Sequence, residues 1–193
     1  GYDMRQYKNL QMFVHAEQMS ALDPELRDGD LTCFIRLGSD LRNNYYEYEI
    51  PLKLTEPGLY NNNNERDREV VWPTENMFDF PLSVLTNAKV ARNKAKRAGN
   101  AGVGNTIPYT IYDDENGKPQ NRITVLGNPT LEEVTTIMIG VRNNGQHEAT
   151  GEVWVNELRL SQFNEQGGVA AMANASLSLS DIAQVNVAGR LET

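Results

Sequence analysis

The chain has 193 residues, 39% of them hydrophobic, and a formal net charge of -8. This length suits one good-sized domain or a domain with an appendage, and the acidic balance excludes nucleic acid as the main partner, because phosphate binding requires a basic surface. The single cysteine, Cys33, excludes an internal disulfide and a cysteine-based metal cluster. No apolar run approaches the roughly 20 residues of a membrane-spanning helix. Residues 1–20 lack a secretory signal pattern, and we expect the chain to be a fragment of a longer protein.

Period-two alternation of apolar residues predicts three strands in the N-terminal part. Residues 10–16 form the first, with one apolar face made by Leu10, Met12, Val14 and Ala16. Residues 31–37 predict the second, in which Cys33 lies on the apolar face and is expected to be buried. Turn residues fill 38–44, and the aromatic-rich run 45–54 predicts the third strand, whose Pro51 indicates a strand end or a sheet edge.

A short strand and one helix are predicted next. Val70–Pro73 predicts the strand, and Asp79 is expected to cap a helix that has Pro81 in its first turn and Leu82, Leu85 and Ala88 on one face. Basic residues crowd the last turns before Gly99, where cations offset the helix dipole: they are Lys89, Arg92, Lys94, Lys96 and Arg97. The dipole explains this run, and an anion-binding patch is the alternative.

The remaining strands are separated by long loops. Residues 109–112 and 123–126 predict strands on either side of the polar stretch 113–119, the β-branched run 134–141 predicts a buried strand, and 153–160 predict a last strand. Many strands with one short helix favour a mainly β fold. We predict a jelly-roll-like β-sandwich over residues 2–162, of the galactose-binding and carbohydrate-binding-module kind.

After a predicted linker at 163–168, residues 169–193 predict an alternating strand pair, that is, a β-hairpin tail. Its odd positions from Val169 to Leu179 are apolar, and the even positions from Asn174 to Ser180 are small and polar. Each segment has about the length of a tilted membrane-spanning strand. The tail is therefore either the start of a barrel wall segment or a hairpin of a soluble sheet, because alternation alone does not separate the two.

Nothing in the sequence indicates an enzyme. The two histidines, His15 and His147, lack the spacing of metal ligands, and no nucleophile motif is present. Asp113–Asn116 could supply oxygen ligands to calcium, but an exposed turn explains the stretch equally well. We expect no cofactor, no metal and no catalytic residue. Tyr46, Tyr48 and Trp72 are the candidates for an aromatic binding surface, with packing in the core as the alternative.

Four long stretches carry a resemblance to a known family: Tyr7–Glu17, Gly29–Gly38, Asn44–Leu52 and Gly151–Leu160. Together they resemble the SprA family, also called Sov, of outer-membrane translocons of the type IX secretion system, which also supports gliding motility in Bacteroidetes. The resemblance implies an insert domain of a very large β-barrel at the cell surface, facing the periplasm or the outside. It implies as partners the rest of the barrel, an outer-membrane shuttle barrel, a periplasmic plug and secreted cargo, with membrane contact through flanking strands only.

A second, shorter resemblance concerns the last predicted strand. Val153–Leu160 is similar to the closing strand of carbohydrate-binding and galactose-binding jelly rolls. It implies the fold more than an activity, and a carbohydrate-binding module of a cell-surface protein is the alternative function. We expect Trp154, Asn156, Glu157 and Arg159 to fasten this strand and to set the direction in which the chain leaves it.

Overall fold

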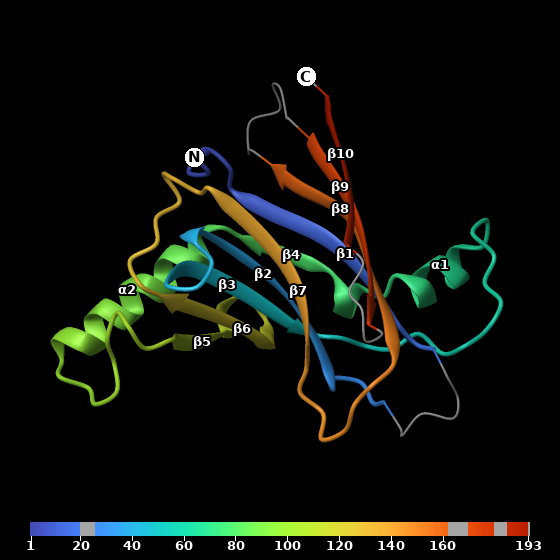
Figure 1. Cartoon of the computed structure of the whole chain (residues 1–193), viewed down its shortest axis with the longest axis horizontal. Helices are drawn as coiled ribbons and strands as arrows, with labels where there is room; N and C mark the ends of the chain where they lie inside the picture. The colour runs from blue at the N-terminus through green and yellow to red at the C-terminus, as the bar shows by residue number, and fades with distance from the viewer. Residues whose placement is uncertain (20–25, 162–169, 180–184, 193) are drawn as a thin grey trace. The chain divides into compact units, whose positions relative to one another are not determined.

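The structure is a computed structural model that describes residues 1–19, 26–161, 170–179 and 185–192, the last two ranges for their backbone only. The described part is mainly β, with two five-stranded antiparallel sheets and two α-helices (Figure 1). None of these helices is long and apolar enough to cross a membrane. The chain forms two compact units: the first comprises Gly1–Lys8, Phe34–Ile50 and Phe80–Gly140, and the second comprises Asn9–Cys33, Pro51–Asp79 and Val141–Thr193.

The second unit contains most of the sheet ordered β10-β9-β8-β1-β4 (Figure 1). Its strands are β1 (Asn9–Gln18), β4 (Phe78–Pro81), β8 (Gly151–Ser161), β9 (Ala170–Leu179) and β10 (Val185–Glu192). The predicted apolar face of β1 is confirmed, because all four of its residues are at most 1% exposed. Cys33 is buried, as expected. The second unit therefore has a core to which the alternation of β1 contributes one whole face.

The tail continues the sheet of the second unit. β9 pairs with β8 in antiparallel register, with Val153 opposite Leu177, and β10 pairs with β9. The hairpin that the alternation predicted is thus present as two further strands at one edge of this sheet. The predicted linker at 163–168 and the turn that joins β9 to β10 lie outside the described residues, and so do the side chains of both strands.

A bulge interrupts the pairing of β1 with β8. Gln11 lies opposite Arg159 and Phe13 lies opposite Asn156, so two residues of β8 face one residue of β1 between these pairs. Glu157 has a φ of 55°, in the left-handed region. The burial pattern shows the consequence, because buried residues occur at Val153 and Val155 and then at Leu158. The extra residue shifts the alternation by one position and turns neighbouring side chains toward a new direction.

The predicted strand at Val70–Pro73 is wrong, because Val70 and Val71 belong to helix α1 (Glu65–Val71). The side chain of Asn64 caps this helix by accepting from the backbone N–H of Arg66 at 3.0 Å. Acidic residues in its first turn, Glu65 and Asp67, suit the positive end of the helix dipole. Local capping therefore outweighs the β-propensity of the two valines.

The first unit contains most of the sheet ordered β5-β6-β3-β2-β7. Its strands are β2 (Leu31–Asp40), β3 (Asn44–Pro51), β5 (Tyr109–Asp113), β6 (Lys118–Leu126) and β7 (Thr136–Asn143). Helix α2 (Ser83–Arg97) packs against β5 and β6 (Figure 1). The predicted helix is confirmed with its buried face of Leu82, Leu85 and Ala88, and Gly99 ends it with a φ of 76°. Asp79 does not cap it; that side chain lies in β4 and accepts from Asn9 Nδ2 at 2.7 Å.

The β-branched run 134–141 was predicted to be a buried strand. The strand is confirmed as most of β7, but the prediction that it is buried is wrong. β7 lies at the edge of its sheet, and none of its residues is fully buried. Ile137 is 41% exposed, whereas Val134, just before the strand, is buried. A run of β-branched residues indicates a strand, but the order of strands in the sheet decides whether that strand is covered.

Ion pairs between arginines and two buried carboxylates hold β3 in the first unit. Arg36 donates to Glu47 Oε2 from Nε at 2.8 Å and from Nη2 at 2.6 Å, and its guanidinium stacks on the ring of Tyr45 at 3.8 Å. Arg122 Nε donates to Glu49 Oε1 at 2.8 Å. Glu47 and Glu49 are only 4% and 3% exposed, so the arginines supply the charge that such burial requires.

Candidate functional site

Helix α1 is fixed on the outer face of β1 in the second unit. His15 lies on that face and its Nδ1–H donates to the carbonyl of Val71, the last helical residue, at 2.7 Å. Thr55 Oγ1 donates to the carbonyl of Val70 at 3.0 Å, and the backbone N–H of Thr55 donates to Ala16 at 2.7 Å. These bonds satisfy carbonyls at the helix end that lack a partner within the helix. They also place Trp72, which follows the helix, against the β1–β8 pair.

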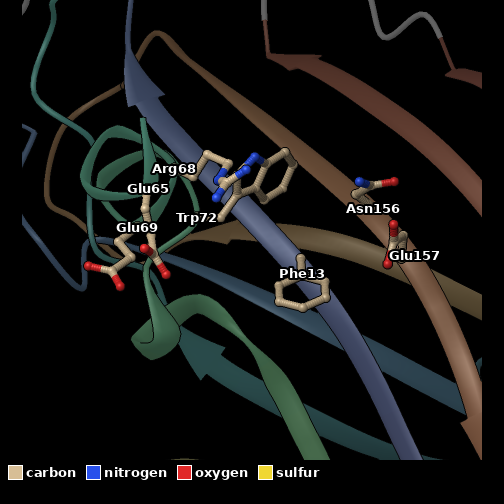
Figure 2. A pocket seen from close by; sticks show the side chains of 7 residues that line it. All are labelled: Phe13, Glu65, Arg68, Glu69, Trp72, Asn156 and Glu157. Atoms are coloured by element: carbon tan, nitrogen blue, oxygen red, sulfur yellow. The ribbon is translucent and has the colours of Figure 1, made fainter. Parts of the chain in front are cut away.

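The arrangement leaves an open hollow of about 410 Å³ on this unit. Its lining residues come from β1, from α1 with the residue that follows it, and from β8: Phe13, Glu65, Arg68, Glu69, Trp72, Asn156 and Glu157. In the view of Figure 2 the two aromatic side chains lie between the charged side chains of α1 and the two residues of β8. The hollow thus combines apolar rings with charged and amide groups on either side.

The β8 side of the hollow depends on the bulge. The extra residue at this point turns both Asn156 and Glu157 into the lining, although adjacent residues of a regular strand point to opposite faces. Glu157 accepts a hydrogen bond from Arg159 Nη2, which keeps its carboxylate paired with a cation. We expected Trp154, Asn156, Glu157 and Arg159 to fasten the strand. The structure places two of them, Asn156 and Glu157, in the lining of the hollow.

Most polar side chains of the hollow have unused hydrogen-bonding capacity. Within the described residues, the side chains of Glu65, Arg68, Glu69 and Asn156 form no hydrogen bond or ion pair, and neither does the indole N–H of Trp72. Aromatic faces combined with such groups are typical of surfaces that bind an extended polar ligand, either a polypeptide or a sugar. The described residues contain no group of His, Cys, Asp and Glu that could hold a metal ion.

Two of the three predicted aromatic candidates are buried in the first unit. Tyr46 and Tyr48 are 1% and 0% exposed, so their rings do not face solvent. The hydroxyl of Tyr46 donates to the carbonyl of Pro129 at 3.0 Å, and burial raises the pKa of Tyr46 to about 12. Trp72, the third candidate, is half-buried and lines the hollow of the second unit.

The other sequence candidates occupy turns or loops. Asp114–Asn116 form a 3-10 turn that ends at Gly117, whose φ of 69° suits glycine. Asp113 is buried and accepts from Tyr48 at 2.5 Å and from Asn116 at 2.6 Å, so its oxygens already serve the protein. This confirms the turn interpretation of the stretch. His147 lies in an exposed loop, where its carbonyl accepts from Asn143 Nδ2 at 2.8 Å.

Reasoning from the sequence missed Phe13 and α1 as parts of a site. Phe13 lies on the side of β1 opposite the predicted apolar face, and an aromatic residue among Gln11, His15 and Glu17 is itself a signal. The start of α1 was also visible, because Asn64 is followed at once by Glu65 and Asp67. Nothing in the sequence marked the bulge at Glu157.

The chain matches a known protein family over its whole length. The family model SprA_N, described as motility related/secretion protein, matches residues 1–193. A comparison with curated proteins found no significant match.

Proposed function

Because the chain belongs to the SprA_N family of motility-related secretion proteins, we propose that it is a structural and interaction domain of the outer-membrane translocon of the type IX secretion system. In this role it takes part in protein export and in gliding motility. The observation that carries the proposal is the family match over the whole chain. The four stretches that resemble the SprA family support the finer assignment to this translocon.

The proposed role is non-enzymatic. The hollow around Trp72 contains carboxylates, a guanidinium and an amide, and its lining includes no serine, cysteine, lysine or histidine that could act as a nucleophile or base of the usual kind. The domain acts by contact with other polypeptides, and the hollow is the surface that we propose for this contact. It needs no cofactor, because binding through aromatic faces and hydrogen bonds suffices.

The proposed partners are the rest of the translocon barrel, an outer-membrane shuttle barrel, a periplasmic plug and secreted cargo. We place the domain in the outer membrane assembly of a Gram-negative bacterium, on the periplasmic or the extracellular side. Nucleic acid is not among the partners, because the net charge of -8 opposes binding to phosphates. A jelly-roll arrangement of the two sheets belongs to the same proposal.

The role of the hollow is tested in the full-length protein by Trp72→Ser, with Trp154→Ser as the matched control. Trp154 is 49% exposed on β8 and does not line the hollow. We expect Trp72→Ser to reduce the secretion of cargo and the spreading of colonies, and Trp154→Ser to leave both unchanged. Immunoblots must show equal amounts of the two variants in the outer membrane. Equal secretion by both variants and the parent would show that the hollow does not bind a partner needed for export.

The tail tests the assignment to a barrel. If strands β9 and β10 contribute to a barrel wall, lipid shields the apolar face of the alternation. In the full-length protein, cysteines at Leu177 and Leu179 are then protected from water-soluble reagents, and cysteines at Ser176 and Ser178 react. Equal labelling of both faces would contradict this part of the proposal.

The hollow also favours a second candidate function, a carbohydrate-binding module. Trp72 and Phe13 lie beside carboxylate and amide groups, and such a combination binds sugar rings in many proteins. This candidate predicts heat on titration with a glycan and its loss in Trp72→Ala. The absence of any glycan ligand on an array would leave the protein-binding role alone.

A further inference from the structure

Helix α2 concentrates positive charge in an acidic protein. Over Ser83–Arg97 it carries five basic residues and no acidic one, whereas the whole chain has a net charge of -8. Within the described residues, none of these five side chains forms an ion pair. Cations in the last turn offset the helix dipole, but Lys89 and Arg92 lie before that turn. Lys89 and Arg92 instead donate to the backbone carbonyls of Pro129 and Gly127. The cations of the last turn have no carboxylate partner within the described residues, so they are available to an acidic ligand as well as to the helix dipole: Lys94, Lys96 and Arg97.

A second hollow, of about 490 Å³, lies beside the C-terminal half of α2 in the first unit. Its lining consists of basic and amide side chains: Arg92, Asn93, Lys96, Arg97, Asn105 and Asn128. The lining contains no carboxylate and no aromatic ring. Lys96 and Arg97 are exposed at its rim, and Arg92 is 1% exposed at its inner side.

The hydrogen bonds of this second hollow orient its amides. Arg92 donates from Nε and Nη2 to Asn93 Oδ1, at 3.3 and 3.1 Å, and Lys96 Nζ donates to Asn105 Oδ1 at 3.5 Å. Arg92 also donates to the carbonyl of Gly127 at 2.5 Å. The amide oxygens of Asn93 and Asn105 are thus occupied by cations, which leaves their NH₂ groups as donors. The surface offers donors and positive charge, the complement of an anion.

The separation of the charges decides which anion fits. Lys96 and Arg97, at the rim of the hollow, project about 100° apart around the helix axis, and Lys94, outside the lining, projects about 200° from Lys96. The three charges therefore do not converge on one point as the donors around a single phosphate do. They suit a ligand whose charges are spread along a chain. Without an aromatic platform, the second hollow lacks the stacking groups of sites for single-stranded nucleic acid. The NH₂ groups of the asparagines can donate to side-chain carboxylates and to backbone carbonyls, and an acidic polypeptide offers both.

We propose that the C-terminal half of α2 and the hollow beside it form a docking site for an acidic polypeptide segment. Arg92 fixes the helix to Gly127 and orients Asn93, while Lys96 and Arg97 contact carboxylates of the bound segment. This site is distinct from the hollow around Trp72. The inference does not depend on the translocon assignment, since it follows from α2 and the hollow beside it.

The test uses the 193-residue chain and a short synthetic peptide in which glutamate alternates with glycine. Lys96→Gln/Arg97→Gln should weaken peptide binding by about tenfold, because it removes two surface ion pairs. The control Arg42→Gln/Arg66→Gln removes the same charge from two exposed arginines elsewhere, and we expect it to change the dissociation constant less than twofold. Binding by the parent chain should weaken as salt increases.

Three results would overturn the proposal. Equal loss of binding in both double variants would show that net charge alone attracts the peptide. Equal binding of a peptide with glutamine in place of glutamate would exclude carboxylate recognition. Inorganic phosphate that displaces the peptide at a lower concentration than the peptide itself would assign the site to a single oxyanion. Circular dichroism of the variants checks that α2 is intact, and an unfolded variant is replaced by the milder Lys96→Gln.

Discussion

The polar groups around Tyr48 in the first unit and those around Trp72 in the second unit differ in how their hydrogen-bonding capacity is used. Tyr48 is fully buried; its hydroxyl donates to Asp113 at 2.5 Å and accepts from Asn121 Nδ2 at 3.1 Å. The side chains lining the hollow around Trp72 are exposed or half-exposed, and most have no partner within the described residues. Satisfied buried groups stabilise the fold, whereas unsatisfied groups at a hollow are available to a ligand.

The largest effect is expected from breaking the polar interior at Tyr48. Its ring stacks on Phe80, with centroids 3.9 Å apart and planes 2° from parallel. Tyr48→Ala removes that ring and the hydrogen bond to Asp113, and should lower the free energy of unfolding by about 3–5 kcal/mol. Tyr48→Phe keeps the stack and should cost about 1–3 kcal/mol. Urea denaturation measures both, and a loss for Tyr48→Phe equal to that for Tyr48→Ala would place all of the stabilisation in the hydroxyl.

The ion pairs of β3 provide a second test of the interior of the first unit, in which a charged partner is removed in place of an aromatic ring. Arg36→Met removes the cation that donates two hydrogen bonds to the buried carboxylate of Glu47, and it should lower the free energy of unfolding by about 3 kcal/mol. Arg122→Met is the comparison, because the side chain of Arg122 is 42% exposed while that of Arg36 is 16% exposed. Water can solvate Glu49 more easily after the second change, so we expect a smaller loss. Equal losses in urea denaturation would show that exposure of the partner is irrelevant.

Alkaline pH should weaken the first unit through Tyr46. Burial raises its pKa to about 12, against an ordinary value of 10.0. Between these values the unfolded chain releases the phenol proton and the folded chain retains it, so stability present below pH 10 is lost as pH rises toward 12. The loss is at most about 3 kcal/mol. Tyr46→Phe should flatten this part of the pH profile of unfolding, and an unchanged profile would contradict the assignment to Tyr46.

Alternation along the chain predicted the faces of individual strands. It did not predict features that depend on contacts between segments far apart in the sequence. The apolar face of β1 followed from period-two spacing alone, because one face of that strand is buried. The position of β7 at a sheet edge did not, since the run 134–141 contains no information about its neighbours. At α1, the cap residue Asn64 was readable, but the helix also depends on His15 and Thr55, which bind its last carbonyls from distant positions in the chain.

The site was less predictable than the fold for the same reason. The hollow around Trp72 joins residues from three separate segments, so no spacing along the chain identifies it. Trp72, Tyr46 and Tyr48 were all proposed from their residue type. Trp72 lines the hollow, whereas Tyr46 and Tyr48 are buried. Residue type alone does not separate an aromatic residue in a core from one at a binding surface.

The smallest expected effect concerns the bulge that separates the hollow from an ordinary sheet. Glu157 holds a φ of 55°, which costs a residue with a side chain about 1 kcal/mol, and glycine adopts it without that strain. Glu157→Gly should therefore raise the free energy of unfolding by about 0.5 kcal/mol, after the entropic cost of glycine is subtracted. Glu152→Gly, on the same strand but without a positive φ, should lower it by about 0.5–1 kcal/mol. Urea denaturation measures both changes. A gain in unfolding free energy for Glu157→Gly together with a loss for Glu152→Gly would show that the backbone of β8 is strained where Glu157 enters the hollow. Equal losses of unfolding free energy would show that the bulge carries no strain. Strain would then give no reason to assign a binding role to the carboxylate of Glu157.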